Sequence, residues 1–336
     1  MNDELKFTVI SDIHYYSKKN FVDGFDKNKK PKPGQLFFSR SEEIVEHTFD
    51  CLCKNDTPDI VLISGDLTYN GERTSHDEMK AALKKRQQKG KRVYVITATH
   101  DYTTPRMPTY GIDKNDKYIE VESVNRTQLL KYYSDFGYNN AIAKHKSTMS
   151  YVAQLADGYR LFALNDDYGD PDCGFSDELM NWVKTEANNA KRDGQYIIAM
   201  THHPLVPPSP IYAAVAKGDM LNDYELRRKQ LSDLGFDFVL TGHTHMHNIS
   251  YCKIGNKKFY DISTAALTGF PPYYRQIVLN KEQKKAEIKT ICADCADSID
   301  TNGLALEEYT KDMFLGVVSK ALYDAEYDYD NFADFA

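Results

Sequence analysis

Residues 59–66 read Asp-Ile-Val-Leu-Ile-Ser-Gly-Asp, an uninterrupted apolar run that ends in a glycine and an aspartate. An apolar run that is this short and does not alternate is typical of a strand buried on both faces of a sheet. Further strand-like segments lie at residues 6–10, 92–96, 149–154, 159–164, 196–200 and 236–241. Early in the chain these segments alternate with helix-like ones, which predicts an α/β layered fold with a largely parallel sheet.

Helix-like segments occupy residues 40–54, 74–89, 126–135, 176–192 and 223–234. Ser41 and Ser176 stand where the first and the fourth of these segments begin, so we expect both serines to cap a helix. Three other stretches carry hairpin signals: Ala156-Asp157-Gly158, Ile254-Gly255-Asn256 and Asn280-Lys281-Glu282. Because hairpins join antiparallel strands, the sequence predicts a second sheet that packs on the first in a layered sandwich.

Short motifs of aspartate and histidine follow five strand-like segments: Asp12-Ile13-His14, Gly65-Asp66, Thr99-His100-Asp101, His202-His203-Pro204 and Gly242-His243-Thr244-His245. Each motif alone is commonplace, but strand ends in an α/β fold converge on one edge, where ligands usually bind. In an extended segment residues i and i+2 share a face, so Asp12 and His14 are expected to reach the same ion. Carboxylates and imidazoles suit a site for two divalent cations, and such sites commonly hydrolyse phosphate esters.

The ordered set of motifs resembles the calcineurin-like metallophosphoesterase family, which includes purple acid phosphatases and class III cyclic nucleotide phosphodiesterases. The motifs extend over residues 12–245. The resemblance implies an α/β fold with four layers, an α/β/β/α sandwich of two mixed sheets. It also implies a dinuclear metal centre whose ligands are Asp12, His14 and His245 at the first metal, His202 and His243 at the second, and Asp66 bridging both.

The resemblance extends to the chemistry of the site. It implies hydrolysis of a phosphomonoester or a phosphodiester, with a metal-bound hydroxide as the nucleophile. His100 resembles the histidine that contacts the phosphate and protonates the leaving group, with Asp101 as its orienting carboxylate. In this family the first histidine of H-x-P is the ligand, so we expect His202 rather than His203 to bind metal. Histidine and aspartate accept Mn, Fe or Zn, so the two divalent ions are expected among these three.

One residue departs from the family pattern. The third motif of the family is Gly-Asn-His followed by Asp or Glu, whereas this chain reads Ala98-Thr99-His100-Asp101. The hydroxyl of Thr99 replaces an amide oxygen that normally binds the second metal, and a neutral hydroxyl is a poorer ligand. We therefore expect a weakened or reshaped second site. A catalytically weakened metal-binding or regulatory module is the alternative function.

The segments between the motifs bear on the substrate, which we expect to be a small phosphorylated molecule. Tyr15, Tyr16, Tyr69 and Tyr102 follow closely on motif residues and could either stack on a base or aryl group or pack at the edge of the site. Lysines in the insert at residues 15–35 could attract phosphates or lie in a solvated loop.

Composition limits the other partners. The formal net charge of −7 argues against the broad basic surface that grips nucleic acid, which disfavours a nuclease. There is no apolar run of about 18 residues, so we expect no membrane span, and the absence of an apolar leader favours a cytoplasmic protein unless a leader was removed. We expect a phosphoesterase domain at residues 1–298, followed at 299–336 by an amphipathic helix and an acidic-aromatic tail packed on it. The oligomeric state is left open.

Overall fold

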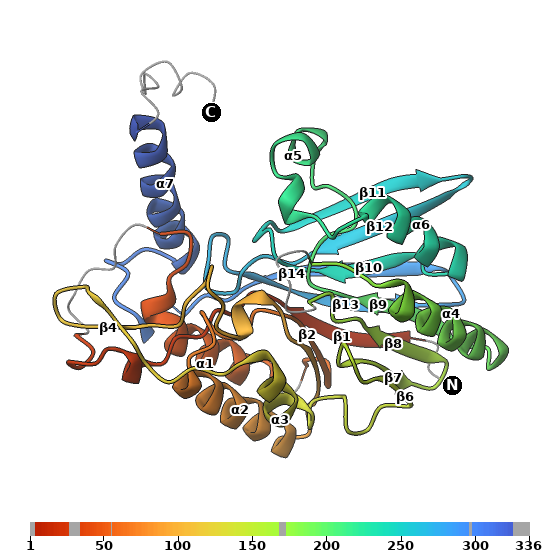
Figure 1. Ribbon diagram of the computed structural model, residues 1–336, viewed down its shortest axis with the longest axis horizontal. Helices are drawn as coiled ribbons and strands as arrows, with labels where there is room; N and C mark the ends of the chain where they lie inside the picture. The colour runs from red at the N-terminus through yellow and green to blue at the C-terminus, as the bar shows by residue number, and fades with distance from the viewer. Residues whose placement is uncertain (1–3, 27–33, 55, 168–172, 296–297, 325–336) are drawn as a thin grey trace.

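Two mixed β-sheets pack face to face at the centre of the structure, a computed structural model that describes residues 4–26, 34–54, 56–167, 173–295 and 298–324 (Figure 1). The first sheet contains, in spatial order, β14 (Lys285–Cys292), β13 (Tyr273–Asn280), β1 (Glu4–Ile10), β2 (Ile60–Ser64) and β3 (Arg92–Ile96). In this sheet β1, β2 and β3 run parallel to one another, and β13 is antiparallel both to β1 and to β14.

The second sheet is wider and also mixed. Its spatial order is β11 (Asn248–Ile254), β12 (Lys257–Ser263), β10 (Phe238–Thr241), β9 (Tyr196–Met200), β8 (Tyr159–Ala163), β7 (Ser150–Ala156) and β6 (Ala143–His145). The four strands β12, β10, β9 and β8 are parallel, while the strands on either side of them pair antiparallel. A small separate hairpin is formed by β4 (Gly111–Ile112) and β5 (Tyr118–Ile119).

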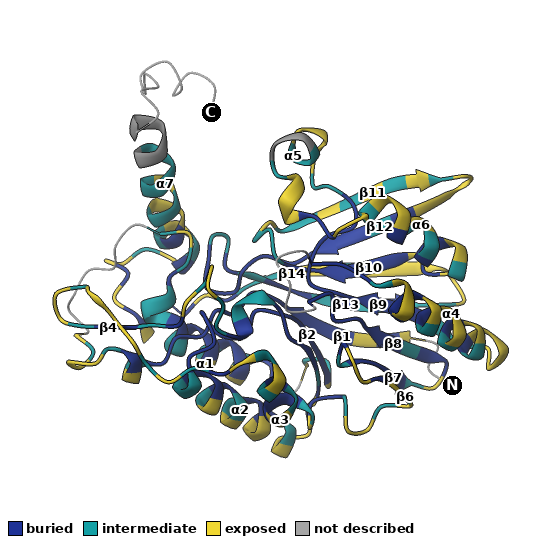
Figure 2. Ribbon diagram, in the orientation of Figure 1, coloured by how far each residue is buried: buried dark blue, intermediate teal, exposed yellow. Residues whose placement is uncertain are grey.

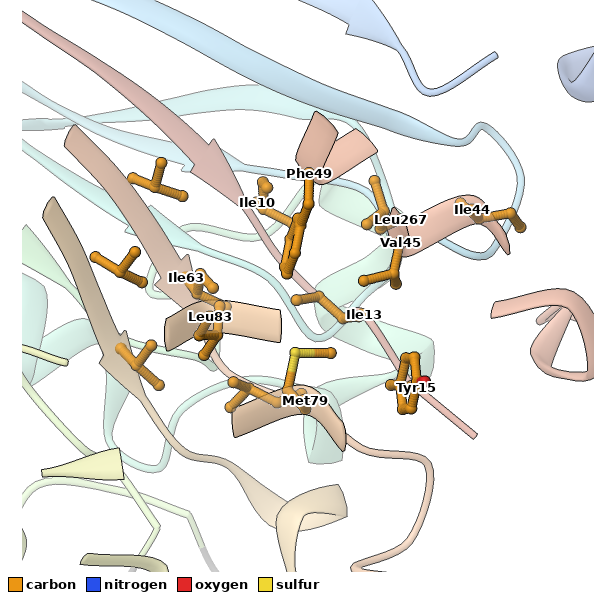
Figure 3. Close-up of a cluster of buried hydrophobic side chains, with 14 of the residues drawn as sticks. Ile10, Ile13, Tyr15, Ile44, Val45, Phe49, Ile63, Met79, Leu83 and Leu267 are labelled. Carbon is orange, nitrogen blue, oxygen red and sulfur yellow. The ribbon is translucent and has the colours of Figure 1, made fainter. Parts of the chain in front are cut away.

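Helices cover the outer face of each sheet, and three apolar cores separate the resulting four layers. The first sheet packs on α1 (Ser41–Cys51), α2 (Arg73–Gln88) and α3 (Leu129–Tyr133), and the second packs on α4 (Asp177–Arg192) and α6 (Tyr224–Leu234). Figure 3 shows Ile10 and Ile63 of the first sheet meeting Phe49 of α1 and Met79 and Leu83 of α2. The predicted α/β/β/α sandwich of two mixed sheets is therefore confirmed.

The decisive run at residues 60–63 is buried on both of its faces, as its lack of alternation predicts. Val61 and Ile63 face the helices, whereas Ile60 and Leu62 face the second sheet, where Leu240 belongs to the same core. The central strands β2 and β10 are accordingly dark in Figure 2, whereas the edge strand β11 and the outward faces of the helices carry exposed residues. Each fully buried leucine or isoleucine in such a strand contributes about 1.5–3 kcal/mol relative to leaving it exposed.

The structure confirms the three predicted hairpins and one of the two predicted helix caps. The three predicted hairpins join β7 to β8, β11 to β12 and β13 to β14. Ser176 caps α4 by accepting a hydrogen bond from the amide of Leu179. The predicted cap at Ser41 is wrong: a 3-10 turn at Phe38–Arg40 runs directly into α1, and the Ser41 hydroxyl instead accepts a hydrogen bond from the amide of Tyr16.

The predicted amphipathic helix is α7 (Leu306–Asp324), which projects from the sandwich in Figure 1. Leu306 is fully buried, and the ring of Tyr309 lies 5.3 Å from that of Phe37, so the first turns dock onto the core as expected. The acidic-aromatic tail at residues 325–336 lies outside the described residues, and the division at residue 298 stays a prediction. Among the described residues, no helix is long and apolar enough to cross a membrane.

Candidate metal centre

The carboxyl ends of strands from both sheets meet at one place, and hydrogen bonds join the segments that follow them. The amide of Asp12, after β1, donates to the carbonyl of Gly65 after β2 at 3.2 Å. The amide of Gly242, after β10, donates to the carbonyl of His202 after β9 at 3.0 Å. The amide of His243 donates to both carboxylate oxygens of Asp12, each at 3.0 Å, so this aspartate links the two sheets.

The backbone at five of the six predicted metal ligands is left-handed rather than extended. Positive φ angles occur at Asp12 (48°), His14 (45°), Asp66 (52°), His243 (66°) and His245 (57°). The argument that residues i and i+2 share a face of an extended segment was therefore wrong, although these side chains do converge. Non-glycine residues in this region cost of order 1–3 kcal/mol each and persist only where surrounding contacts hold them, typically at functional sites.

Two glycines permit the close approach of these loops. A Cβ atom on Gly65 would lie 2.6 Å from Nδ1 of His202, and one on Gly242 would lie 2.3 Å from Oδ2 of Asp12. Gly65 also has a φ of +104°, which side-chain-bearing residues rarely adopt. Both positions therefore require glycine because the ligands lie against the backbone.

The first group of candidate ligands comprises Asp12, His14 and His245, whose ligand atoms all lie within 4.8 Å of one another. The Nε2 atoms of His14 and His245 are 3.1 Å apart, and Nε2 of His245 is 3.4 Å from Oδ1 of Asp12. Asp12 and His14 are fully buried. Two imidazole nitrogens beside a carboxylate form a donor set that suits a divalent cation of the Mn, Fe or Zn type.

The second group comprises Asp66, His202 and His243. Oδ2 of Asp66 lies 3.1 Å from Nε2 of His202 and 3.7 Å from Nε2 of His14, so one carboxylate oxygen faces ligands of both groups. Asp66 and His14 also form a third group with His100. The structure thus brings together all six predicted metal ligands, with Asp66 in the position of a bridge.

The tautomer of His202 supports a cation at this point. Its Nδ1 donates to the carbonyl of Ser64 at 2.8 Å, which leaves a lone pair on Nε2 in the neutral ring. That nitrogen is buried and faces the Asp66 carboxylate, which also carries only lone pairs. Two such groups repel each other unless a positive charge lies between them, and a metal supplies it as well as a proton does. A backbone carbonyl that fixes the ring in this way is also the usual support of a metal-binding histidine.

The pKa shifts describe the same environment. Burial alone would lower the pKa of His202, but the negative charges of Asp66 and Asp12 outweigh it and hold that pKa well above the usual range. Burial, with the nearby His100, lowers the pKa of His14 to about 3. Burial and the neighbouring His203 lower the pKa of His243. His14 and His243 are therefore neutral at physiological pH, the form in which imidazole binds metal.

His100 lies beside the first group, with its ring centroid 4.8 Å from that of His14. Its Nδ1 is held by the carbonyl oxygen of Tyr69 at 2.7 Å and by Oδ1 of Asn70 at 2.8 Å, and its amide donates to Asp66 at 3.0 Å. Because both acceptors face Nδ1, that nitrogen carries the hydrogen, and Nε2 is left to accept or release a proton.

Asp101 does not orient this ring, contrary to the prediction. Its carboxylate accepts hydrogen bonds from the amides of Thr68 and Ala98, each at 2.9 Å, and so shapes the loop that presents His100. Burial and the charge of Asp66 raise the pKa of Asp101 to about 8. The ring is oriented by Tyr69 and Asn70 instead, since the side chains at positions 100 and 101 leave the 3-10 turn in different directions.

Asp166 is a buried residue of the site that sequence reasoning missed. Its Oδ2 accepts hydrogen bonds from the amides of His202 and His203 and from the hydroxyl of Thr201, at 2.7–3.1 Å. Its Oδ1 lies 3.2 Å from Nδ1 of His203, whose ring lies 4.0 Å from that of His243. Burial alone would raise the pKa of Asp166, but His203 outweighs it and holds that pKa at about 2. Its position directly after a predicted strand was the available signal.

Residues 5–247 match the sequence model of the calcineurin-like phosphoesterases, and this stretch contains every candidate ligand. The chain belongs to the calcineurin-like phosphoesterase family. The earlier resemblance is thus confirmed, and the chain is assigned to a family of hydrolases. No curated protein matches its sequence.

Among solved structures, a dimetal phosphatase from Danio rerio resembles the phosphoesterase with a TM-score of 0.56 and 12% identity, covering 86% of this chain and 99% of that one. A sulfate thiohydrolase from Thermus thermophilus has a TM-score of 0.42 and 10% identity, covering 94% of this chain and 60% of its own. An NAD nucleotidase from Haemophilus influenzae has a TM-score of 0.44 and 13% identity, covering 85% and 49%. At these identities the likeness to the phosphatase shows the shared fold.

Proposed function

We propose that this phosphoesterase hydrolyses a phosphate ester, either a monoester or a diester, at a centre of two divalent ions. The observation that carries the proposal is Oδ2 of Asp66, which faces His14 of one ligand group and His202 of the other. A carboxylate shared in this way is what a two-metal clamp requires. Asp12, His14 and His245 would hold the first ion, His202 and His243 the second, and Asp66 both.

Bound divalent ions supply charge neutralisation for the phosphate group and activate a water for attack on phosphorus. The chain supplies the remaining functions. Asp12 and His243, joined by hydrogen bonds, hold the ligands of the two sheets in register. His100 presents Nε2 beside the first ligand group, because Tyr69 and Asn70 fix Nδ1. We assign to this nitrogen the proton that passes to the departing ester oxygen.

The proposal is tested by assaying metal-reconstituted protein against p-nitrophenyl phosphate and its bis-ester, with Mn²⁺, Zn²⁺ or Fe²⁺ supplied. We expect hydrolysis of at least one ester and a content of two ions per chain. His100→Ala should lower kcat by about 100-fold or more, the usual contribution of a positioned acid, while the metal content stays unchanged. His47→Ala, on α1 and outside all three ligand groups, is the matched control.

Two results would overturn the proposal. Absence of turnover on both esters with both ions bound would show a binding module without catalysis. Parallel loss of turnover and of one ion in His100→Ala would show that His100 is a ligand, as its group with His14 and Asp66 allows.

A further inference from the structure

A cavity of about 620 Å³ opens on one side of the metal centre. Three histidines of the centre line it, His14, His100 and His245, whereas His202 and His243 do not. The cavity therefore adjoins the first ligand group and the histidine to which we assign the proton transfer. Pockets of roughly 300–1,000 Å³ suit organic ligands much larger than a phosphate group, so the cavity has room for the alcohol part of an ester.

Aromatic rings make up much of the remaining wall: Phe21, Phe25, Phe37, Phe38, Tyr69, Tyr110 and Tyr118. Tyr69 connects this wall to the metal centre, since its ring centroid lies 6.4 Å from that of His14 and 4.8 Å from that of Phe38. On its other side Tyr69 lies 6.2 Å from Tyr110, edge to face. The ring of Tyr118 lies 4.1 Å from that of Tyr110 and is 71% exposed, so an aromatic residue faces solvent at the mouth.

Part of this wall is built by two segments outside the five metal-binding motifs. Phe21 lies in the insert after the first motif, and Tyr110 and Tyr118 lie on and beside the β4–β5 hairpin. The segments are paired, because the backbone at Phe21 bridges that at Ile112 and the amide of Val22 donates to the carbonyl of Ile112 at 3.0 Å. The wall is thus fixed by main-chain contacts and is formed before a ligand arrives.

A planar aromatic group suits this wall, because such a group stacks on aromatic side chains whatever its hydrogen-bonding pattern. Among the residues that the structure describes, the charged side chains of the cavity lining are those of Asp26, Asp113, Asp116 and Lys114.

We infer that the ester hydrolysed here carries a planar aromatic group on its leaving alcohol, and that the cavity binds this group. The inference rests on the proposed function for the reaction itself. In that reaction the water oxygen bonds to phosphorus, the bond from phosphorus to the aromatic-bearing oxygen breaks, and the departing alcohol takes its proton from His100. The aromatic wall selects the alcohol, whereas the residues of the metal centre and His100 serve the bond-breaking step.

Binding tests the inference without turnover. Calorimetry of the metal-loaded protein with 2-naphthylphosphonate and methylphosphonate, which do not hydrolyse, should show about 10- to 100-fold tighter binding of the naphthyl compound, as base–aromatic stacking provides. Equal affinities of the naphthyl and methyl compounds would overturn the inference and leave the proposed hydrolysis standing.

Tyr118→Ala tests whether the aromatic wall causes the preference for the naphthyl compound. The ring of Tyr118 is exposed, so it can be removed with little risk to folding. We expect the ratio of naphthyl to methyl affinity to fall at least about fivefold, the lower end of the stacking contribution. Tyr251→Ala, a 52% exposed tyrosine on β11, is the matched control and should leave the ratio unchanged. If both variants change the ratio equally, the wall does not select the substrate. Hydrolysis of 2-naphthyl phosphate and methyl phosphate, followed by phosphate release, should show the same ratios in kcat/KM.

Discussion

Replacing Gly242 with alanine should weaken the binding of one ion at the centre. An added Cβ would lie 1.9 Å from the hydroxyl oxygen of Ser11 and 2.3 Å from Oδ2 of Asp12. Cβ contacts under 3.0 Å are essentially never seen, so the Asp12 oxygen must move by at least about 0.7 Å. Metal–ligand distances tolerate about 0.2 Å, so this displacement exceeds the tolerance more than threefold.

We expect the affinity for the first ion to fall by at least about 10- to 100-fold, the cost of disturbing even a residue that only supports a ligand. Because Asp12 is fully buried, the overpacking should also lower the free energy of unfolding by about 1–3 kcal/mol. Titration of Mn²⁺ into the metal-free protein measures the affinity, and urea unfolding measures the stability.

Gly218→Ala is the matched control, since an added Cβ there has no heavy atom within 4 Å. The second group, Asp66, His202 and His243, should keep its ion better than the first. Two ions bound by Gly242→Ala with unchanged affinity would refute the reasoning, because Asp12 could then hold its ion from a displaced position.

Three further perturbations have defined outcomes. Thr99→Asn should raise the affinity for the second ion, because it restores an amide oxygen as a ligand. Equal and full occupancy by two ions in the original protein and in the variant would contradict the expectation that the second site is weakened. Asp166→Asn should lower the affinity for the second ion about 10-fold or more in a Mn²⁺ titration, because the Asp166 carboxylate fixes the backbone amides of His202 and His203. An unchanged affinity would show that the side-chain amide of asparagine fixes them equally well. Burial raises the pKa of Glu72 from its usual 4.5 to about 7, so the folded protein holds a proton that the unfolded chain releases, and stability falls as pH rises between these values. By linkage this loss is of order 3 kcal/mol, and Glu72→Gln should abolish it in urea unfolding at pH 5 and pH 8; an identical pH dependence in the variant argues against burial as the cause.

The buried strands and the convergence of the motifs were predictable because each depends on local signals. The uninterrupted apolar run at residues 60–63 specifies a strand buried on both faces, and the Gly65-Asp66 pair that follows it specifies where the chain turns. Parallel strands deliver such turns to one edge, so the motifs were expected to meet there. The four layers and the assignment of six side chains as ligands came instead from the resemblance to the family.

The details that failed depend on contacts between segments far apart in sequence. The left-handed backbone at Asp12 exists because its carboxylate receives the amide of His243, a residue from the other sheet. The partner of His100 is Asn70 rather than Asp101 because the loop after β2 folds under the imidazole. The aromatic cavity brings together Phe21 and Tyr110, whose pairing no periodic pattern signals.

The late positions of His243 and His245 in the chain also determine when the candidate metal centre can first form. One ligand group needs His245 and the other needs His243, while their remaining members come from much earlier in the chain. During translation, neither group is complete until the segment after β10 has left the ribosome and the two sheets have closed on each other. Partly made chains therefore display aspartates and histidines without a complete ligand group, and both groups are completed together once this segment has emerged.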